Sequence, residues 1–228
     1  MEEYALLAKA SYEYSQAGRE RVEQELREHG EEFHVDPALS DAYTVVLVRP
    51  DGSAVVSYRG TQELGDLVPD AQLALGMTGK RVHEARQRFK EARDKYGHVV
   101  ATGHSLGGHL ALDAARYHDG EAVVFNPGSS PVYGAPHAVL CGMGGCHSKP
   151  STIYTTGRDP ISLSSFMFDR VTDRVVRVRP RRDGDALSHS LSHFLPPKPL
   201  LVPQRSARPH SSFCHQFPEL CPARVVGA

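Results

Sequence analysis

The sequence contains no apolar run long enough to cross a membrane, which takes about 20 residues. It also lacks an excess of either charge: 26 Lys and Arg stand against 27 Asp and Glu, for a formal net charge of -1. A balanced charge removes the electrostatic reason to bind nucleic acid or an anionic membrane as the main partner. We therefore expect no transmembrane segment and no nucleic-acid partner.

A secretory leader pattern is missing from the first residues of the sequence. Glu2 and Glu3 stand where a signal peptide carries positive charge, and Lys9 interrupts the apolar run that follows. We interpret this segment as a helix of the mature protein. The resulting expectation is an intracellular location, cytoplasmic or virion-associated, rather than secretion.

Cysteine is scarce, and tryptophan is absent altogether. The four cysteines form two pairs whose spacings, C-x4-C and C-x6-C, are wider than the C-x2-C of zinc knuckles: Cys141, Cys146, Cys214 and Cys221. Without a secretion signal, disulfides are not the first expectation. We favour free thiols and expect no metal and no organic cofactor, with disulfides and a zinc site as the alternatives.

What the sequence does contain is an alternation of strand and helix patterns. Two β-branched runs flank Pro50-Asp51-Gly52 and predict a hairpin. The expected helices are 2–30, 80–96 and 109–117, and the expected strands are 43–48, 54–58, 98–102, 121–126, 152–156 and 175–178. The alternation predicts an α/β fold with a mostly parallel central sheet and helices on both faces.

Composition divides the chain into two parts. Residues 1–195 are predicted to form one folded domain, because their number suits a single core. Residues 196–228 are rich in Pro, Ser and Arg and are predicted to form an extended tail. Within the domain, residues 64–79 alternate apolar and acidic side chains and are predicted to form a short helix or cap segment.

One local motif carries the functional hypothesis. Residues 103–107 read Gly-His-Ser-Leu-Gly, the G-x-S-x-G pattern, between a predicted strand and a predicted helix. The glycines are needed because a serine at such a sharp turn leaves no room for side chains two residues away. The pattern predicts Ser105 as a nucleophile in an α/β-hydrolase fold, with the Leu106 amide as a donor to the oxyanion.

A serine nucleophile needs a histidine base and usually an acid behind it, in the chain order Ser, acid, His. Asp159 follows a predicted strand and a glycine turn, so it is the candidate acid. His189 and His193 lie four residues apart, late in the chain, and either could reach the serine. We favour His189, because His193 stands beside the apolar Phe194, which is predicted to face the core. Thr61 ends the hairpin's second strand and is the candidate second oxyanion donor.

Six segments, in this order, resemble the class 3 or fungal-type lipase family: SYRGT, ELGDLVPDAQL, VVATGHSLGGHLALDAA, VVFNPGSSP, TTGRDPISL and HSLSHFL. The resemblance implies an α/β-hydrolase fold and esterase or lipase activity. It also implies a nucleophile, an acid, a base and two oxyanion donors, namely Ser105, Asp159, His189, Thr61 and the Leu106 backbone. The chain departs from the secreted members in being shorter and in lacking the Trp that is common near their lid.

The predicted reaction is hydrolysis of carboxylic esters, of acylglycerols or of phospholipid acyl groups, through an acyl-enzyme. The expected partner is a lipid or a small acyl ester, with transient contact at a membrane surface. Two other classes of function compete with this reading. One is a non-catalytic binding module on a hydrolase fold, and the other is a zinc-binding protein built on the four cysteines.

Overall fold

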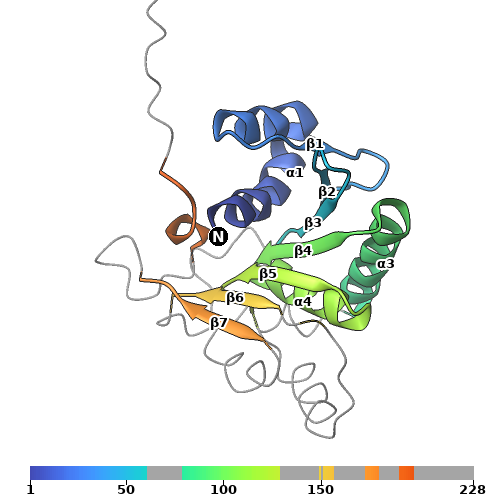
Figure 1. Cartoon of the computed structure of the whole chain (residues 1–228), viewed down its shortest axis with the longest axis vertical. Helices are drawn as coiled ribbons and strands as arrows, with labels where there is room; N and C mark the ends of the chain where they lie inside the picture. Colours follow the sequence, from blue (N-terminus) through green and yellow to red (C-terminus); the bar gives the residue numbers. More distant parts are fainter. Residues whose placement is uncertain (61–78, 129–148, 150, 157–172, 180–189, 198–228) are drawn as a thin grey trace, which may run out of the picture. The chain divides into compact units, whose positions relative to one another are not determined.

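Seven strands form one sheet in which neighbours in space follow one another along the chain, in the order β1-β2-β3-β4-β5-β6-β7. The computed structural model describes residues 1–60, 79–128, 149, 151–156, 173–179 and 190–197 (Figure 1). The strands are β1 (His34–Val35), β2 (Thr44–Val48), β3 (Ala54–Tyr58), β4 (Val99–His104), β5 (Glu121–Phe125), β6 (Thr152–Thr155) and β7 (Arg174–Arg177). The pairs β1–β2 and β2–β3 are antiparallel, and all pairs from β3 to β7 are parallel. The prediction of a mostly parallel sheet is confirmed.

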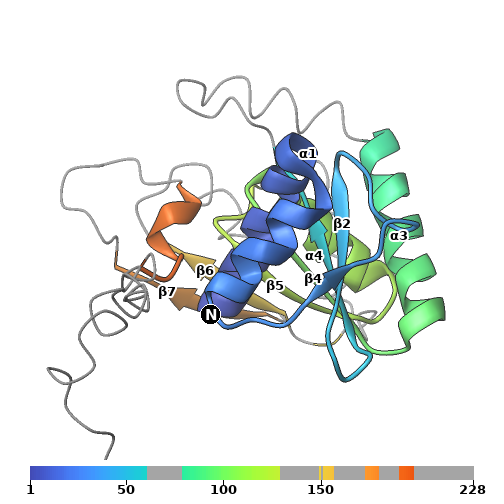
Figure 2. The same ribbon diagram turned by 90° about the horizontal axis from the view of Figure 1, so that it is seen from above.

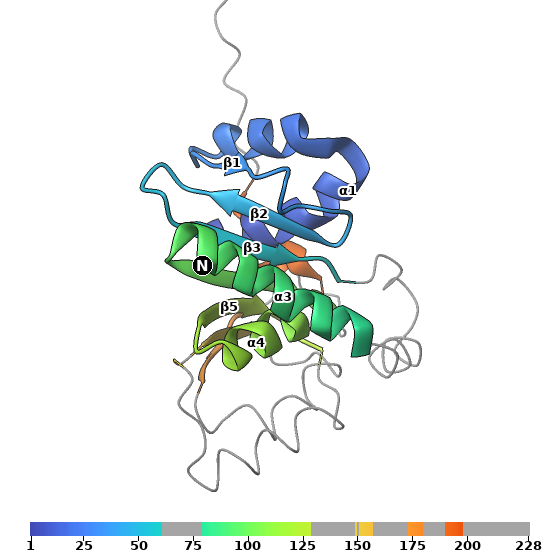
Figure 3. The ribbon, with the colours of Figure 1, turned by 90° about the vertical axis from the view of Figure 1, so that its right-hand side faces the viewer.

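Helices cover both faces of this sheet. Figures 2 and 3 show α1 (Glu2–Glu28) on one side of the strands, with α3 (Gly79–Tyr96) and α4 (Leu106–Tyr117) on the other. Strand β2 shows why, because its side chains alternate between the faces. Val45 and Leu47 pack in the cluster that includes α1, whereas Val46 and Val48 pack with α3 and α4. Burying each such side chain contributes about 1.5–3 kcal/mol.

The hairpin of β2 and β3 has the turn that its sequence predicts. Gly52 takes a positive φ of 84°, which a side chain would disfavour, and its amide donates to the Arg49 carbonyl at 3.0 Å. Asp51 Oδ1 accepts from the Ser53 amide at 2.8 Å. The turn sets the register of the hairpin, with Val48 opposite Ala54 and Thr44 opposite Tyr58.

The first helix differs from the single helix expected over residues 2–30. Helical geometry is interrupted at Gly18, whose φ is 78° and ψ is -173°. The break turns the chain, so that the first half carries Leu7 and Ala8 into the core and the second half carries Val22 and Leu26. Strand β1 was not predicted either, because two residues are too short for a periodicity to be visible.

Several expectations lie outside the described residues. They include the helix or cap segment predicted over residues 64–79, apart from residue 79, all four cysteines, and the tail predicted over residues 196–228, apart from its first two residues. The described residues belong to one unit, Met1–Pro197, and the division of the chain after residue 195 stays a prediction. Among the described helices, none combines the length and the apolar character that crossing a bilayer requires.

Candidate active site

Ser105 is the single residue between β4 and α4. Its φ of 57° and ψ of -126° lie in a region that residues with a side chain rarely adopt, so the chain turns sharply at this point. Two hydrogen bonds hold the turn: the Ser105 amide donates to the Phe125 carbonyl at 3.2 Å, and its own carbonyl accepts from the Gly128 amide at 3.0 Å. The strand–turn–helix context expected for the G-x-S-x-G motif is therefore present.

The two glycines of the motif are required by the packing of backbone on backbone. A methyl group on Gly103 would lie 2.4 Å from the Gly107 carbonyl oxygen. One on Gly107 would lie 2.0 Å from the Tyr58 carbonyl oxygen and 2.9 Å from the Gly60 amide nitrogen. Because these neighbours are backbone atoms, neither contact can be relieved by turning a side chain. The motif thus brings the end of β3 into direct contact with the start of α4 beside Ser105. We call this contact, made by Tyr58, Gly60, Ser105 and Gly107, the serine corner.

The atoms next to Ser105 suit stabilisation of negative charge. Leu106 is the first residue of α4, and the first four amides of a helix have no acceptor within the helix. The Ser105 side chain makes no capping hydrogen bond to α4. The role of the Leu106 amide as an oxyanion donor stays a prediction. Ser105 itself is 3% exposed.

The end of β3 lies against the same corner. A methyl group on Gly60 would lie 2.8 Å from the His104 carbonyl oxygen and 3.5 Å from the Gly107 amide nitrogen. Gly60 directly precedes Thr61, the predicted second oxyanion donor, which lies outside the described residues. The expected proximity of this strand end to Ser105 is thus found for Gly60, and the role of Thr61 stays a prediction.

Tyr12 contacts this corner and was missed by the sequence argument. Its hydroxyl oxygen lies 3.3 Å from His104 Nδ1 and also accepts a hydrogen bond from the Gly60 amide. Burial raises the pKa of Tyr12 to about 12, so the phenol is protonated at neutral pH. No pattern in the sequence distinguishes Tyr12 from the other tyrosines of its helix. His104 is buried beside Tyr12.

The loops after β5 and β6 join the corner through Asn126. The Asn126 amide donates to the Tyr154 carbonyl at 2.8 Å, and its Oδ1 accepts from the Thr156 amide at 3.0 Å. Asn126 has a positive φ of 38°, the strained backbone that such a fixed position requires. Thr156 stands three residues before Asp159, which lies outside the described residues. The segment that leads to the predicted acid therefore starts at the edge of the sheet that holds Ser105.

Of the two candidate bases, His189 lies outside the described residues and His193 lies within them. His193 ends a short 3-10 helix, η2 (Leu191–His193), and is 2% exposed. Phe194 is fully buried, and its ring centroid lies 5.1 Å from that of Phe125, so its predicted core position is confirmed. The choice of His189 stays a prediction.

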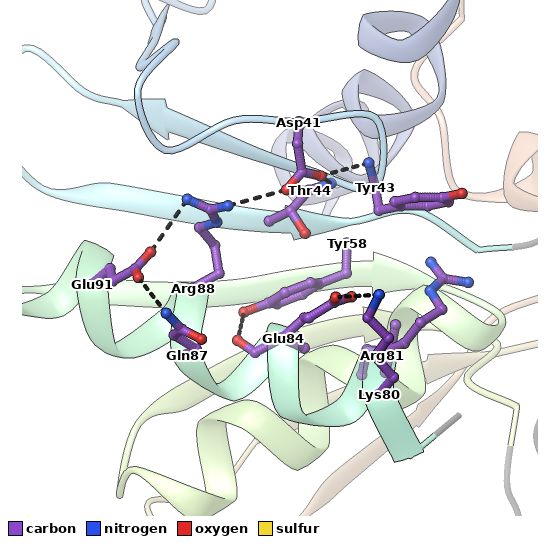
Figure 4. Close-up of a pocket in the computed structure, with 12 residues that line it drawn as sticks. Asp41, Tyr43, Thr44, Tyr58, Lys80, Arg81, Glu84, Gln87, Arg88 and Glu91 are labelled. Atoms are coloured by element: carbon purple, nitrogen blue, oxygen red, sulfur yellow. Dashed lines mark hydrogen bonds and ion pairs between the residues drawn. The ribbon is translucent and has the colours of Figure 1, made fainter. Parts of the chain in front are cut away.

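A polar groove of about 330 Å³ runs between α3 and the strands β2 and β3, and Ser105 does not line it. In Figure 4, Arg88 reaches Asp41 on one side and Glu91 on the other, at 3.1 Å and 3.2 Å. Tyr43 and Arg81 lie at the other end of the groove (Figure 4). Among the described residues there is no group of three or more His, Cys, Asp or Glu side chains suited to a metal ion.

Comparisons with known proteins agree with a lipid-directed enzyme. Residues 3–129, more than half of the chain, match a family model described as a Tle-like phospholipase domain. A stretch of 99 residues is 33% identical to an extracellular phospholipase A1 of Serratia liquefaciens, and it covers 41% of this chain and 31% of that protein. The chain thus spans about a third of the length of this relative. The family match includes Tyr12, Gly60 and Ser105, but ends before Asp159 and His189.

The expected intracellular location, cytoplasmic or virion-associated, is wrong by this comparison, because the relative is an extracellular enzyme. The expectation rested on a missing leader pattern, and a leader pattern reports only one route of export. The expected chemistry is confirmed at a coarser level, since both comparisons name phospholipases rather than fungal-type lipases. The matching family model covers more than half of the sequence and includes Ser105. This chain therefore belongs to the Tle-like phospholipase domain family.

Proposed function

We propose that this protein is a phospholipase that hydrolyses acyl esters of phospholipids through a covalent acyl-enzyme on Ser105. The observation that carries the proposal is the backbone of Ser105, at φ 57° and ψ -126° between β4 and α4. Strain of this kind persists only where the surroundings enforce it, and it is concentrated at functional sites. The match to a phospholipase family supplies the substrate class.

The proposed reaction follows from the residue types. His189 takes the proton of the Ser105 hydroxyl, and the oxygen attacks the ester carbonyl. The oxyanion accepts hydrogen bonds from the Leu106 amide and from Thr61, and each donor contributes about a hundredfold or more in rate. Collapse of the intermediate transfers the proton from His189 to the departing glycerol oxygen. Water then attacks the acyl-enzyme by the same route and releases the fatty acid, while Asp159 orients the imidazole.

Two observations support these assignments without testing them. The amide of Thr156 is fixed to Asn126 Oδ1 at 3.0 Å, so the chain that leads to Asp159 starts close to the serine. The order of the motifs resembles that of the class 3 lipases, and this resemblance supports His189 as the base. By similarity to the Serratia liquefaciens enzyme, we propose cleavage of the sn-1 ester and action outside the producing cell.

Covalent labelling with a fluorophosphonate tests the nucleophile directly. The wild-type protein should be labelled on Ser105, and Ser105→Ala should lose the label together with at least about 10⁴-fold of its phosphatidylcholine hydrolysis. His189→Ala should lose both as well, because the serine is no longer deprotonated. Thermal unfolding of each variant shows whether the fold is kept.

His193→Asn is the matched control, since it removes the other imidazole of the pair. We expect it to be labelled at close to the wild-type rate when folded. Loss of labelling in His193→Asn, with labelling retained in His189→Ala, would reverse the assignment of the base. A folded wild-type protein that takes no label would instead make the chain a non-catalytic binding module.

A further inference from the structure

Two arginines share one exposed tyrosine ring at the end of β3. The guanidinium carbon of Arg59 lies 5.0 Å from the centroid of the Tyr43 ring, and that of Arg81 lies 4.8 Å from it. Arg81 Nη2 also donates to the Arg59 carbonyl at 2.9 Å. Contacts between a guanidinium and a ring face are attractive and help to hold the two cations in place. We call these three residues the arginine–tyrosine cluster.

The positive charge of this cluster is only partly offset by the described residues, of which Glu84 acts on Arg81 without forming an ion pair with it. No carboxylate of the described chain forms an ion pair with Arg59 or Arg81, and the buried Arg59 Nε has no hydrogen-bond partner there. Glu84, one turn along α3 from Arg81, lies 3.6 Å from Lys80 Nζ instead. Burial lowers the pKa of Arg81, and the neighbouring charge of Arg59 lowers it further. Two cations are thus held together at a cost that a bound anion would remove.

The cluster lies on the same edge of the sheet as Ser105. Strands β3 and β4 run parallel with Tyr58 opposite Gly103, so Arg59 and Ser105 both follow the ends of neighbouring strands. Gly60, the residue after Arg59, packs against the serine corner. The positive charges of Arg59 and Arg81 both act on the hydroxyl of Tyr12, which is bonded to Gly60. Gly60 and Tyr12 therefore lie between the two arginines and the candidate nucleophile.

We infer that the arginine–tyrosine cluster binds the phosphate of a glycerophospholipid whose acyl ester lies at Ser105. This inference rests on the proposed function and adds a determinant of substrate class. A phosphodiester offers two non-bridging oxygens that share one negative charge, and these match the paired donors of a guanidinium. In such a lipid only a few bonds separate the phosphate from the acyl esters. A neutral acylglycerol has no group for these arginines, so the cluster favours phospholipids over neutral lipids.

The ratio of two activities tests the inference. Phosphatidylcholine and a diacylglycerol with the same acyl chains are presented in the same uncharged detergent micelles, which removes attraction to a charged surface. In Arg81→Gln, kcat/KM for phosphatidylcholine relative to diacylglycerol should fall about tenfold, the size expected for a lost hydrogen bond to a charged group. Arg88→Gln is the matched control: Arg88 lies on the same helix, but it already pairs with Asp41 and Glu91, and its ratio should be that of the wild type.

Competition separates a lipid headgroup from a free anion. Glycerophosphocholine should slow diacylglycerol turnover by the wild type more than equimolar inorganic phosphate does, and this inhibition should weaken in Arg81→Gln. An unchanged substrate ratio in folded Arg81→Gln would overturn the inference, and so would inhibition by inorganic phosphate alone. If the wild type turned over neither lipid, the proposed function would fail instead. Binding of glycerophosphocholine to wild type and Arg81→Gln, measured by calorimetry, would then still test the anion site.

Discussion

The two ends of the layer formed by α3 and α4 differ in whether their arginines form ion pairs. At the end away from Ser105, Lys95 pairs with Asp36 at 2.6 Å, and Arg116 pairs with the buried Asp173. At the end beside Ser105, Arg59 and Arg81 have no carboxylate partner among the described residues. Paired charges fix layers to one another, whereas uncompensated charges raise the free energy of the unliganded protein. This difference is what we expect if one end serves stability and the other binds the proposed phosphate.

The largest effect is expected from a substitution that disturbs the end beside Ser105 without changing its charge. Gly107→Ala places a methyl group 2.0 Å from the Tyr58 carbonyl oxygen, and backbone has to move to relieve the contact. We expect at least about a hundredfold loss of phospholipid hydrolysis, because a displacement near 1 Å at the serine costs that much, together with a lower melting temperature. Gly79→Ala is the control, since a methyl group there meets nothing within 4 Å. Wild-type activity in Gly107→Ala would contradict the crowded corner.

At the same end, removal of the Tyr12 hydroxyl distinguishes a role in positioning the site from a role in packing. Tyr12→Phe keeps the ring but removes the hydroxyl that binds the Gly60 amide and lies 3.3 Å from His104 Nδ1. We expect kcat to fall about tenfold with KM little changed, because the oxyanion side of the corner loses its support, at a stability cost of about 1 kcal/mol. Tyr14→Phe, on the same helix, should leave kcat unchanged. An equal loss in both variants would indicate a general packing effect.

The paired end is tested by its response to acid. Burial acts to raise the pKa of Asp36, but hydrogen bonds from Lys95, Tyr96 and the Ala38 amide outweigh it, so the pKa lies below the usual 3.8. A carboxylate whose folded pKa is lowered stabilises the protein above its unfolded pKa, and this stability is lost as the pH falls through the folded value. Asp36→Asn should therefore lower stability at pH 7 by about 1–2 kcal/mol and flatten the loss of stability below about pH 4.

Urea unfolding at pH 7 and pH 3 measures both effects of Asp36→Asn. Asp94→Asn is its control. Asp94 pairs with Lys90 on the exposed side of α3, the helix that carries Lys95, and such exposed pairs contribute little to stability. An equal change in the two variants would show that the buried Asp36 with its partners contributes no more than a carboxylate in a surface pair. The contrast between the two ends of the layer would then lose its energetic basis.

Much of the fold and the centre of the site could be predicted because short-range patterns carry them. Runs of β-branched residues marked β2 and β3, the Pro-Asp-Gly turn marked their hairpin, and the glycines around Ser105 marked the sharp turn after β4. The break at Gly18 could not be predicted in the same way, because a glycine inside a helical pattern is tolerated at a modest cost. Location was predicted wrongly because the missing leader pattern, on which the prediction rested, reports only one route of export.

What the sequence determined by itself is the kind of backbone at Ser105. The sharp turn requires glycine at positions 103 and 107, because only a residue without a side chain fits where two backbone segments touch. Tertiary structure alone decided that Tyr12, 93 residues before Ser105, would meet Gly60 and His104, and that Arg59 and Arg81 would share one ring. The reason is that such contacts depend on the order and direction of the strands, and no periodicity along the chain records them.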